Sequence, residues 1–416
     1  MPDLSLKLKQ IKKQQPKLAS LSLGQRNQIL RKLARFLWQY RKLILRANKT
    51  DQKQVRRAEM KDRLILTSKR IRVMAKSLFE VAKLPDSLNK VLEIRKPKNG
   101  LVIKKVSVPL GTVAVIYESR PNVTVDLASL ALKSGNALVL KGGSEAYCTN
   151  KVLVDIIRKV LRQNNLPQSL IYLISPKDDW KKVLLSAYGL IDVIIPRGGE
   201  SLIRWVRQNS KLPIIETGAG VCHTFVDEKF NLKDAVNIIV NAKTQRPSVC
   251  NALDTLVIHQ LVIKKLLPVL AAPLAKWRVE IFADNESCRL LKNYYPADLL
   301  KTAKPEHYGR EFLSLKMAIK TVKNFAEGLK FVKENTSGHS EAILSKDRNH
   351  INTFLTEIDA AVVYANASTR FTDGGEFGMG AEVGISTQKL HARGPMGLEA
   401  LTSYKWVVVG QGQIRK

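Results

Sequence analysis

Cys250 is the side chain whose surroundings best suit covalent chemistry. It ends a polar segment, Gln245-Arg-Pro-Ser-Val-Cys250, which stops any preceding helix, and an apolar run begins at Leu253. A thiol in such a loop beside Arg246 is placed for partial exposure and a lowered pKa, the two properties of a nucleophilic cysteine. Glu216 comes thirty-four residues earlier (250 − 216) and is followed by Thr-Gly-Ala-Gly. A cysteine taken alone is more often an inert buried thiol, so the hypothesis that Cys250 is a nucleophile depends on the residues around it.

Two Gly-Gly pairs follow apolar runs and precede helical patterns. They lie in Lys141-Gly142-Gly143-Ser144-Glu145 and in Arg197-Gly198-Gly199-Glu200. Such a pair after a buried strand exposes N–H groups at the next helix N-terminus, where they and the helix dipole suit a phosphate. A purely structural turn is the alternative at each junction, and a strict G-x-G-x-x-G fingerprint is absent. Two junctions upstream of a thiol predict covalent chemistry on a carbonyl with a phosphate-bearing cofactor.

Length and composition exclude several classes of protein. The 416 residues predict two or three domains, and no apolar stretch reaches the roughly 18 residues of a membrane helix. The first residues lack the apolar region of a signal peptide. The four cysteines have neither paired nor metal-ligand spacing: Cys148, Cys222, Cys250 and Cys288. We therefore expect a cytoplasmic protein with reduced thiols and no metal site.

The formal net charge of +33 raises nucleic-acid binding as an alternative function. Residues 1–105 hold 29 Lys and Arg against 7 Asp and Glu, so 22 (29 − 7) of the excess charges fall there. These basic residues are spread along helical patterns, and aromatic residues for base stacking are few. We therefore favour a lysine-rich, solvated surface without a nucleic-acid function. Loss of the Cys250 motif would have favoured a nucleic-acid-binding protein, but the motif is intact.

The apolar pattern predicts an α/β fold. Residues 1–98 are mostly helical in pattern, and strands are expected at 101–108 and 111–117. Further short apolar runs alternate with helical patterns, at residues 137–140, 171–174, 191–195, 213–215, 253–259 and 360–365. This alternation is typical of parallel sheets with helices on both faces.

The glycine-rich stretch 374–397 is the other unusual segment. Apolar side chains are interleaved with it or lie beside it: Phe371, Phe377, Met379 and Ile385. Flexible linkers are not built this way, so we expect the stretch to pack against a site.

Several blocks of the sequence are long enough to be specific to one family. They include Glu216-Thr-Gly-Ala-Gly and Gln245-Arg-Pro-Ser-Val-Cys-Asn-Ala. Further blocks lie at residues 108–111, 116–126, 133–146, 193–199, 337–343, 366–398 and 401–405. On these residues the chain resembles the gamma-glutamyl phosphate reductase family of the aldehyde dehydrogenase superfamily. The resemblance implies an aldehyde-dehydrogenase-like fold with three regions and a homo-oligomer.

The same resemblance implies a role for each region. An NADP(H)-binding domain would comprise residues 1–117 and 135–219, and a catalytic domain carrying Cys250 would span 220–365. Residues 118–134 and 366–416 would form an oligomerisation element and a tail that lines the site.

The implied reaction is the NADPH-dependent reduction of L-glutamyl 5-phosphate to L-glutamate 5-semialdehyde, the second step of proline biosynthesis from glutamate. Cys250 would attack the acyl carbonyl and expel phosphate, and the thioester would accept a hydride. Its own N–H and Asn122 would hold the oxyanion. Arg120, Arg246 and Arg370 would bind the phosphate and the α-carboxylate, in an order that the sequence leaves open. Glutamate kinase would be a possible channelling partner.

By similarity to the superfamily, the Gly-Gly junctions and a later glutamate would hold the cofactor. Lys141 would reach the adenosine ribose or its 2′-phosphate, Gly198, Gly199 and the helix from Glu200 would face the pyrophosphate, and Glu311 would contact the nicotinamide ribose. Glu216 matches the carboxylate that activates water in hydrolytic aldehyde dehydrogenases. Here it has three alternatives: thiol activation, cofactor contact or loop structure. A hydrolytic dehydrogenase is the nearest alternative function.

Overall fold

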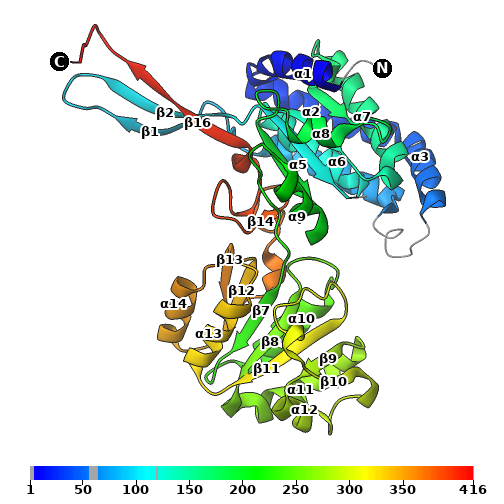
Figure 1. Cartoon of the computed structure of the whole chain (residues 1–416), viewed down its shortest axis with the longest axis vertical. Helices are drawn as coiled ribbons and strands as arrows, with labels where there is room; N and C mark the ends of the chain where they lie inside the picture. Colours follow the sequence, from blue (N-terminus) through cyan, green and yellow to red (C-terminus); the bar gives the residue numbers. More distant parts are fainter. Residues whose placement is uncertain (1–3, 56–63, 119, 416) are drawn as a thin grey trace. The chain divides into compact units, whose positions relative to one another are not determined.

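The computed structural model describes residues 4–55, 64–118 and 120–415. Contacts along the chain divide it into two compact units, which we describe separately. Unit 1 comprises Met1–Thr217, Gly378–Gly384 and Pro395–Lys416, and unit 2 comprises Gly218–Phe377 and Ile385–Gly394. Each unit is built on a parallel sheet (Figure 1), which confirms the expected α/β fold class.

The sheet of unit 1 has the strand order β5-β4-β3-β6. All its pairs are parallel, and the strands are β3 (Thr112–Tyr117), β4 (Ala137–Lys141), β5 (Ile171–Leu173) and β6 (Val193–Arg197). Every residue of β3 is buried, as expected for a central strand covered on both faces. The strand expected at 213–215 is present only as an isolated bridge between Ile194 and Ile214.

Helices supply the rest of unit 1. They are α1 (Leu4–Ala19), α2 (Leu23–Gln39), α3 (Arg41–Gln54), α5 (Ser68–Lys83), α6 (Pro121–Lys133), α7 (Tyr147–Arg162), α8 (Trp180–Leu185) and α9 (Glu200–Asn209). The helical prediction for residues 1–98 is thus confirmed for long stretches, while part of it, residues 56–63, lies outside the described residues. A capping box between Ser22 and Gln25 starts α2, and the buried Ile29, Leu33 and Leu37 repeat at helical spacing.

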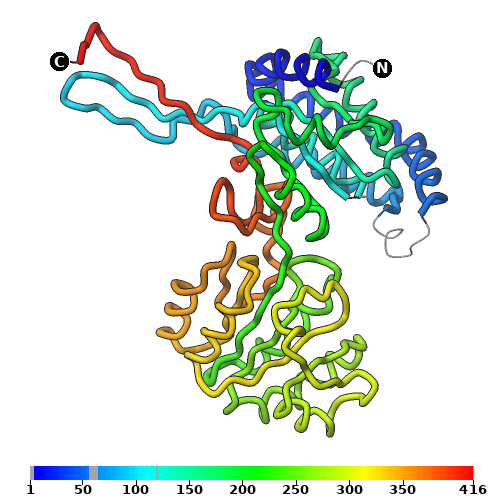
Figure 2. The backbone as a smooth tube through the Cα atoms, viewed as in Figure 1, coloured from blue at the N-terminus to red at the C-terminus, as the bar shows by residue number. Residues whose placement is uncertain are grey.

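A three-stranded antiparallel sheet contradicts the helical prediction at its C-terminal end. Strand β1 (Val91–Arg95) pairs with β2 (Val102–Pro109), and β2 pairs with β16 (Thr402–Val409) from the far end of the chain. Figure 2 shows the cyan hairpin running beside the red strand. Four of the five residues of β1 are exposed, so it lacks the buried stripe that stabilises a helix or a central strand.

Unit 2 contains a seven-stranded parallel sheet of order β10-β9-β11-β8-β7-β12-β13. Its strands are β7 (Cys222–Val226), β8 (Leu253–His259), β9 (Glu280–Ala283), β10 (Leu300–Thr302), β11 (Lys316–Val322), β12 (Ser340–Leu344) and β13 (Val362–Ala365). The strands predicted at 253–259 and 360–365 are therefore confirmed as β8 and β13.

The helices of unit 2 divide between the two faces of this sheet (Figure 1). They are α10 (Leu232–Thr244), α11 (Ile263–Lys276), α12 (Asn285–Leu291), α13 (Phe325–Asn335) and α14 (Arg348–Glu357). Leu256 and Ile258 of β8 belong to the core that includes α10 and α11, whereas Val257 belongs to the core that includes α13 and α14. The period of two along the strand thus sends alternate side chains to opposite cores.

The glycine-rich stretch contributes to both units, and the short strands β14 (Ile385–Ser386) and β15 (Gly394–Pro395) lie in it. Val383, Ile385 and Met396 are buried, which confirms packing for this part. Phe371 and Phe377 are exposed by 50% and 41%, so the packing expected from them is absent. No helix in the described ranges has both the length and the apolar character that a membrane crossing needs.

Asp51 determines how α7 begins. This carboxylate is 1% exposed and accepts hydrogen bonds from the N–H groups of Cys148 (3.1 Å) and Thr149 (2.7 Å) and from the Thr149 hydroxyl (2.5 Å). It therefore satisfies N–H groups that the first turn of a helix leaves open, and it joins α3 to α7.

We expect Asp51→Ala to lower the free energy of unfolding by at least about 2 kcal/mol, because two N–H groups lose their buried acceptor. The matched control is Asp155→Ala on the exposed face of the same helix, with an expected change within about 0.5 kcal/mol. Chemical denaturation followed by circular dichroism measures both. Equal stability of the two variants would contradict the capping role.

Candidate active site

The Cys250 loop lies between α10 and β8, at the amino edge of the unit 2 sheet. Cys250 is partly exposed, whereas Cys222 at the start of the neighbouring strand β7 is buried. The Cys222 thiol donates to the carbonyl oxygen of Cys250 at 3.2 Å. A Cβ on Gly220 would lie 1.7 Å from the same carbonyl oxygen. Only glycine therefore lets the 218–220 segment pass directly behind the thiol-bearing loop.

Arg370 ties the two sides of this loop together. Its Nε donates to the Gln245 side chain at 2.8 Å, and its Nη1 donates to the Asn251 side chain. Burial lowers the pKa of Arg370, the nearby positive charge of Arg246 lowers it further, and the Cys250 thiol acts in the opposite direction. The structure thus brings together three residues predicted for the site, Cys250, Arg246 and Arg370.

Glu311 belongs to the same group in unit 2. Its carboxylate accepts a hydrogen bond from the Gly220 N–H at 3.0 Å, and the next N–H, of Phe312, donates to Asp254 at 3.0 Å. Glu311 is therefore linked through Gly220 to the backbone behind Cys250.

The sequence did not reveal a series of buried polar contacts that links His339, Ser340 and Thr372 next to Cys222. His339 Nδ1 lies 2.8 Å from the Ser340 hydroxyl and 4.0 Å from the Cys222 sulfur, and Ser340 contacts the Thr372 hydroxyl at 2.7 Å. Burial lowers the pKa of His339 to about 4, so this imidazole is neutral at pH 7. The polar residues in the block at 337–343 were the available signal.

His223 and Glu341 are a second buried pair in unit 2. Neither side chain is exposed, and His223 Nδ1 lies 3.0 Å from Glu341. The backbone N–H of His223 also donates to this carboxylate at 2.8 Å. The pair joins the neighbouring strands β7 and β12 and has the contacts of a structural histidine.

In unit 1 the predicted cofactor residues follow strands β4 and β6, at the carboxyl edge of the sheet. Lys141 ends β4, donates to the Gly142 carbonyl at 2.8 Å and lies 5.1 Å from the centre of the Trp180 ring. Burial lowers its pKa, against the effect of Glu145. A Cβ on Gly142 would lie 2.6 Å from the Asn150 amide, so close packing is sufficient to require this glycine.

The helix after the first Gly-Gly pair differs from the sequence expectation. A 3-10 turn (Ser144–Ala146) follows Gly143, and the side chains of Ser144 and Glu145 contact each other at 3.3 Å. The α-helix begins only at Tyr147, and Asp51 already accepts from N–H groups of its first turn. Any phosphate contact at this junction must therefore come from Lys141 and the turn rather than from the start of α7.

The second junction leads directly into a helix. Gly199 is the N-cap of α9, and its N–H donates to the Glu118 carboxylate at 2.6 Å. A Cβ on Gly198 would lie 2.7 Å from the Glu118 side chain. Arg197 Nη1 donates to the backbone carbonyl of Val383 at 2.7 Å. Glu200 forms an ion pair with Arg204 on the exposed face of α9.

Arg120, Asn122 and Glu216 also lie in unit 1. Arg120 is the N-cap of α6, and the Asn122 amide donates to Asp126 at 3.3 Å. The Glu216 carboxylate accepts from two nitrogens of Arg207, at 2.6 Å from Nε and more closely from Nη2. These two hydrogen bonds from Arg207 fix the side chain of Glu216, which lies two residues before the start of unit 2.

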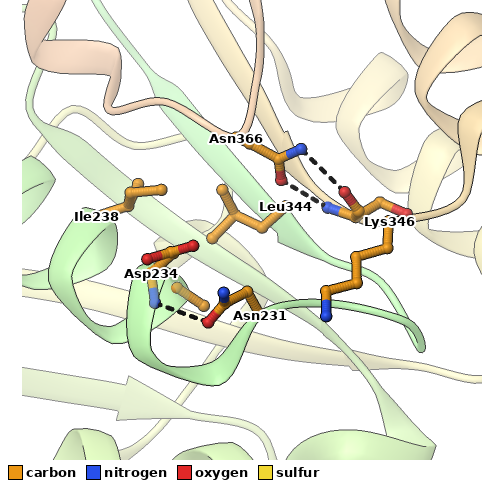
Figure 3. Close-up of a pocket in the computed structure, with 8 residues that line it drawn as sticks. Asn231, Asp234, Ile238, Leu344, Lys346 and Asn366 are labelled. Carbon is orange, nitrogen blue, oxygen red and sulfur yellow. Dashed lines mark hydrogen bonds between the residues drawn. The ribbon is translucent and has the colours of Figure 1, made fainter.

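A separate pocket of about 210 Å³ lies in unit 2 where β7, β12 and β13 end, at the edge opposite Cys250. The Asn366 side-chain oxygen accepts from the Ser345 N–H at 3.0 Å, and its side-chain nitrogen donates to the Ser345 carbonyl at 2.9 Å. Both hydrogen bonds are drawn as dashed lines in Figure 3. Asn231 likewise accepts from the N–H of Asp234. None of the residues predicted for the site lines this pocket.

Comparisons with known proteins agree on one family. The aldehyde dehydrogenase family profile matches residues 3–288. The chain is 51% identical to a gamma-glutamyl phosphate reductase of Pelodictyon phaeoclathratiforme over 94% of this chain and 93% of the relative. It is 49% identical to one of Legionella pneumophila (strain Paris) over 99% of both. The crystal structure of gamma-glutamyl phosphate reductase from Thermotoga maritima matches with a TM-score of 0.94 and 42% identity, over all of both chains.

We expect Gly220→Ala to displace the Cys250 loop, because the new Cβ and the Cys250 carbonyl cannot occupy their present positions. The free energy of unfolding should fall by about 1–3 kcal/mol, and the rate of Cys250 alkylation by iodoacetamide should change. The control is Ser248→Ala, an exposed position of the same loop, which should leave both quantities unchanged. Wild-type stability and alkylation in Gly220→Ala would contradict this role of the glycine.

Proposed function

Because the chain belongs to the aldehyde dehydrogenase family, and within it to the gamma-glutamyl phosphate reductases, it is an oxidoreductase, and we propose that it reduces L-glutamyl 5-phosphate to L-glutamate 5-semialdehyde. In this proposal the enzyme carries out the second step of proline biosynthesis from glutamate. The observation that carries the proposal is the partly exposed Cys250 thiol in a loop shared with Arg246 and tied by Arg370.

Cys250 is the proposed nucleophile. Its thiolate forms a bond to the acyl carbon, the bond between that carbon and the phosphate oxygen breaks, and inorganic phosphate leaves with the electron pair. The product is a thioester on Cys250. After hydride addition to the acyl carbon, the carbon–sulfur bond breaks, the aldehyde forms and the thiolate is restored. Two arginines near the thiol support this role, because positive charge favours the thiolate.

The arginines also suit the anionic substrate. Acyl phosphate and α-carboxylate together carry charges that planar guanidinium groups bind with two parallel hydrogen bonds. We propose that Arg246 and Arg370 bind these groups beside Cys250 and that Arg120 contributes from unit 1. The Cys250 N–H and the Asn122 amide are the proposed donors to the oxyanion.

A nicotinamide cofactor follows from membership of the family, and we propose NADP(H). When bound, it supplies the hydride that reduces the thioester. Residues of unit 1 fit its phosphates and ribose: Lys141 is a cation beside an aromatic ring, and Gly142, Gly143, Ser144 and Glu145 form the turn that follows it. Arg197, Gly198, Gly199 and Glu200 are proposed for the pyrophosphate of the cofactor, at a junction where the Glu118 carboxylate accepts from the Gly199 N–H. Glu311 of unit 2 is proposed for the nicotinamide ribose.

The contact between Glu216 and Arg207 favours the reductase over a hydrolytic dehydrogenase. A general base for water must be free to accept a proton near pH 7. The two hydrogen bonds from Arg207 occupy both oxygens of the Glu216 carboxylate. This arrangement supports the loop-structure role among the three alternatives for Glu216.

We also propose that the chain forms a homo-oligomer through the sheet of β1, β2 and β16. Ile94, Tyr404, Trp406, Val408 and Val409 of this sheet are 45% to 55% exposed. Edge strands and exposed apolar side chains of this kind are typical of a surface that pairs with another chain. A channelling contact with glutamate kinase remains a prediction from the family resemblance.

The decisive measurement is NADP⁺ reduction by the purified enzyme given glutamate 5-semialdehyde, with and without inorganic phosphate. We expect turnover that requires phosphate and that falls at least about 10³-fold in Cys250→Ala, because the nucleophile is lost. Turnover through Cys250 without phosphate would instead assign a hydrolytic dehydrogenase. No turnover in either condition would overturn the proposed function.

For the oligomer we expect Val408→Asp to lower the mass in solution, because it introduces a charge into an apolar contact. Size-exclusion chromatography with light scattering measures the mass. Leu261→Asp, an equally apolar residue of unit 2 that is 70% exposed, is the matched control and should keep the wild-type mass. An unchanged mass in Val408→Asp would assign the interface to another surface.

A further inference from the structure

Two buried charged side chains flank the Cys250 loop without a part in the chemistry above. Lys243 lies in the last turn of α10, directly before the loop, and Asp254 lies in β8, directly after it. Their side chains are 0% and 2% exposed, and Lys243 Nζ lies 3.8 Å from Asp254 Oδ1. The pair therefore closes the two ends of the segment that carries the thiol.

Stability alone does not account for this pair. Within the described part of the chain, Lys243 Nζ and Asp254 Oδ2 have no hydrogen-bond partner. Burying two charges costs more than their attraction returns unless hydrogen bonds complete the geometry, so an apolar pair of similar size would serve the fold as well. A residue pair that weakens or barely stabilises the fold at this position points to a functional role.

Asp254 connects three parts of the site. Its Oδ1 accepts from the Phe312 N–H at 3.0 Å, and the preceding residue, Glu311, accepts from the Gly220 N–H at 3.0 Å. Gly220 in turn lies against the carbonyl of Cys250. The contacts form a closed ring from the start of β8, through the Glu311 segment and Gly220, back to the thiol-bearing loop.

The charges of the pair reach the sulfur of Cys222, whose thiol donates to the carbonyl oxygen of Cys250. Burial raises the pKa of Asp254 to about 7, against the effects of Lys243 and the Phe312 N–H, while Glu311 raises it further. Burial lowers the pKa of Lys243, and Asp254 and the Cys222 thiol oppose this. The Cys222 thiol, whose sulfur lies 3.2 Å from the Cys250 carbonyl oxygen, has its pKa raised by burial first and then by Glu341, Asp254, Cys250 and Glu311.

We propose that the Lys243–Asp254 pair is a positioning element, in which Asp254 fixes the Cys250 loop against the Glu311 segment and Lys243 balances the buried carboxylate. The inference rests on the proposed function only in that Cys250 is the nucleophile. Neither Lys243 nor Asp254 touches the substrate in this arrangement, so both act through the position and the electrostatic surroundings of the thiol.

The first test titrates the Cys250 thiol in the free enzyme. The rate of iodoacetamide alkylation is measured against pH for the wild type, Asp254→Asn and Lys243→Met, with Cys250→Ala as background. Removing the carboxylate should lower the midpoint and removing the ammonium should raise it, each by about 0.5–1 pH unit. Glu311, Glu341, His339, Arg246 and Arg370 are unchanged in every variant. If the midpoints of both variants shift in the same direction, or neither shifts, the proposed electrostatic effect of the pair on the Cys250 thiol is overturned. A loop that is merely loosened would shift both midpoints in the same direction.

The second test separates positioning from folding. Asp254→Asn and Lys243→Met should each lower kcat about 10- to 100-fold, with KM changed less than about threefold, because a displaced thiol loses its alignment. The double variant Lys243→Met/Asp254→Asn should regain thermal stability, since no buried charge is left unpaired, but it should not regain kcat. Recovery of kcat together with stability would reduce the pair to a structural role.

Asp227→Asn is the matched control. This carboxylate is also 0% exposed and accepts from His350 (2.8 Å) and Ser345 (2.6 Å), but it follows β7 at the opposite edge of the same sheet. Its substitution should leave kcat within about threefold of the wild type. If the wild type shows no NADP-linked turnover while the opposite alkylation shifts persist, the proposed function fails and the positioning role stands.

Discussion

The contact between the backbone at Gly220 and the carbonyl of Cys250 is the constraint on which the arrangement of unit 2 depends. It fixes two loops at the amino edge of neighbouring parallel strands, and the Cys222 thiol and Glu311 add hydrogen bonds to the same place. Because β7 pairs with β8 in parallel, with Cys222 opposite Leu253, the loops that precede the two strands lie at the same edge of the sheet. Any side chain larger than hydrogen at Gly220 would separate the loops, and the thiol would lose the backing against which it is held.

The two units use opposite edges of their sheets. In unit 1 the predicted cofactor residues follow β4 and β6 at the carboxyl edge, as is general for nucleotide sites in α/β proteins. In unit 2 the thiol precedes β8, and the carboxyl edge instead holds the separate pocket lined by Asn231 and Lys346. The proposed cofactor residues and the proposed nucleophile therefore lie at different edges of their sheets, the carboxyl edge in unit 1 and the amino edge in unit 2.

The sequence predicted the α/β alternation and the placement of Arg246 beside Cys250, because hydrophobic periodicity and neighbouring polar residues are local signals. The grouping of Arg370 with Cys250 was predicted from the family resemblance instead. It could not predict that Asp51 occupies the start of α7 or that β1 pairs through β2 with β16, because both contacts join distant parts of the chain. The Glu216–Arg207 pair and the buried Lys243–Asp254 pair are likewise tertiary. The burial of Lys243 and Asp254 is visible only after folding, since each reads as an ordinary surface residue in the sequence.

The discontinuity of unit 1 determines the order in which the chain can fold. Residues 218–377 leave the ribosome as one segment that contains nearly all of unit 2, whereas unit 1 needs Gly378–Gly384 and Pro395–Lys416 to complete its contacts. Strand β2 therefore waits, with one edge unpaired, for about three hundred residues to be synthesised before β16 arrives. Until β16 is synthesised, the nascent protein thus carries an open strand edge, and an open edge of this kind can pair with another chain.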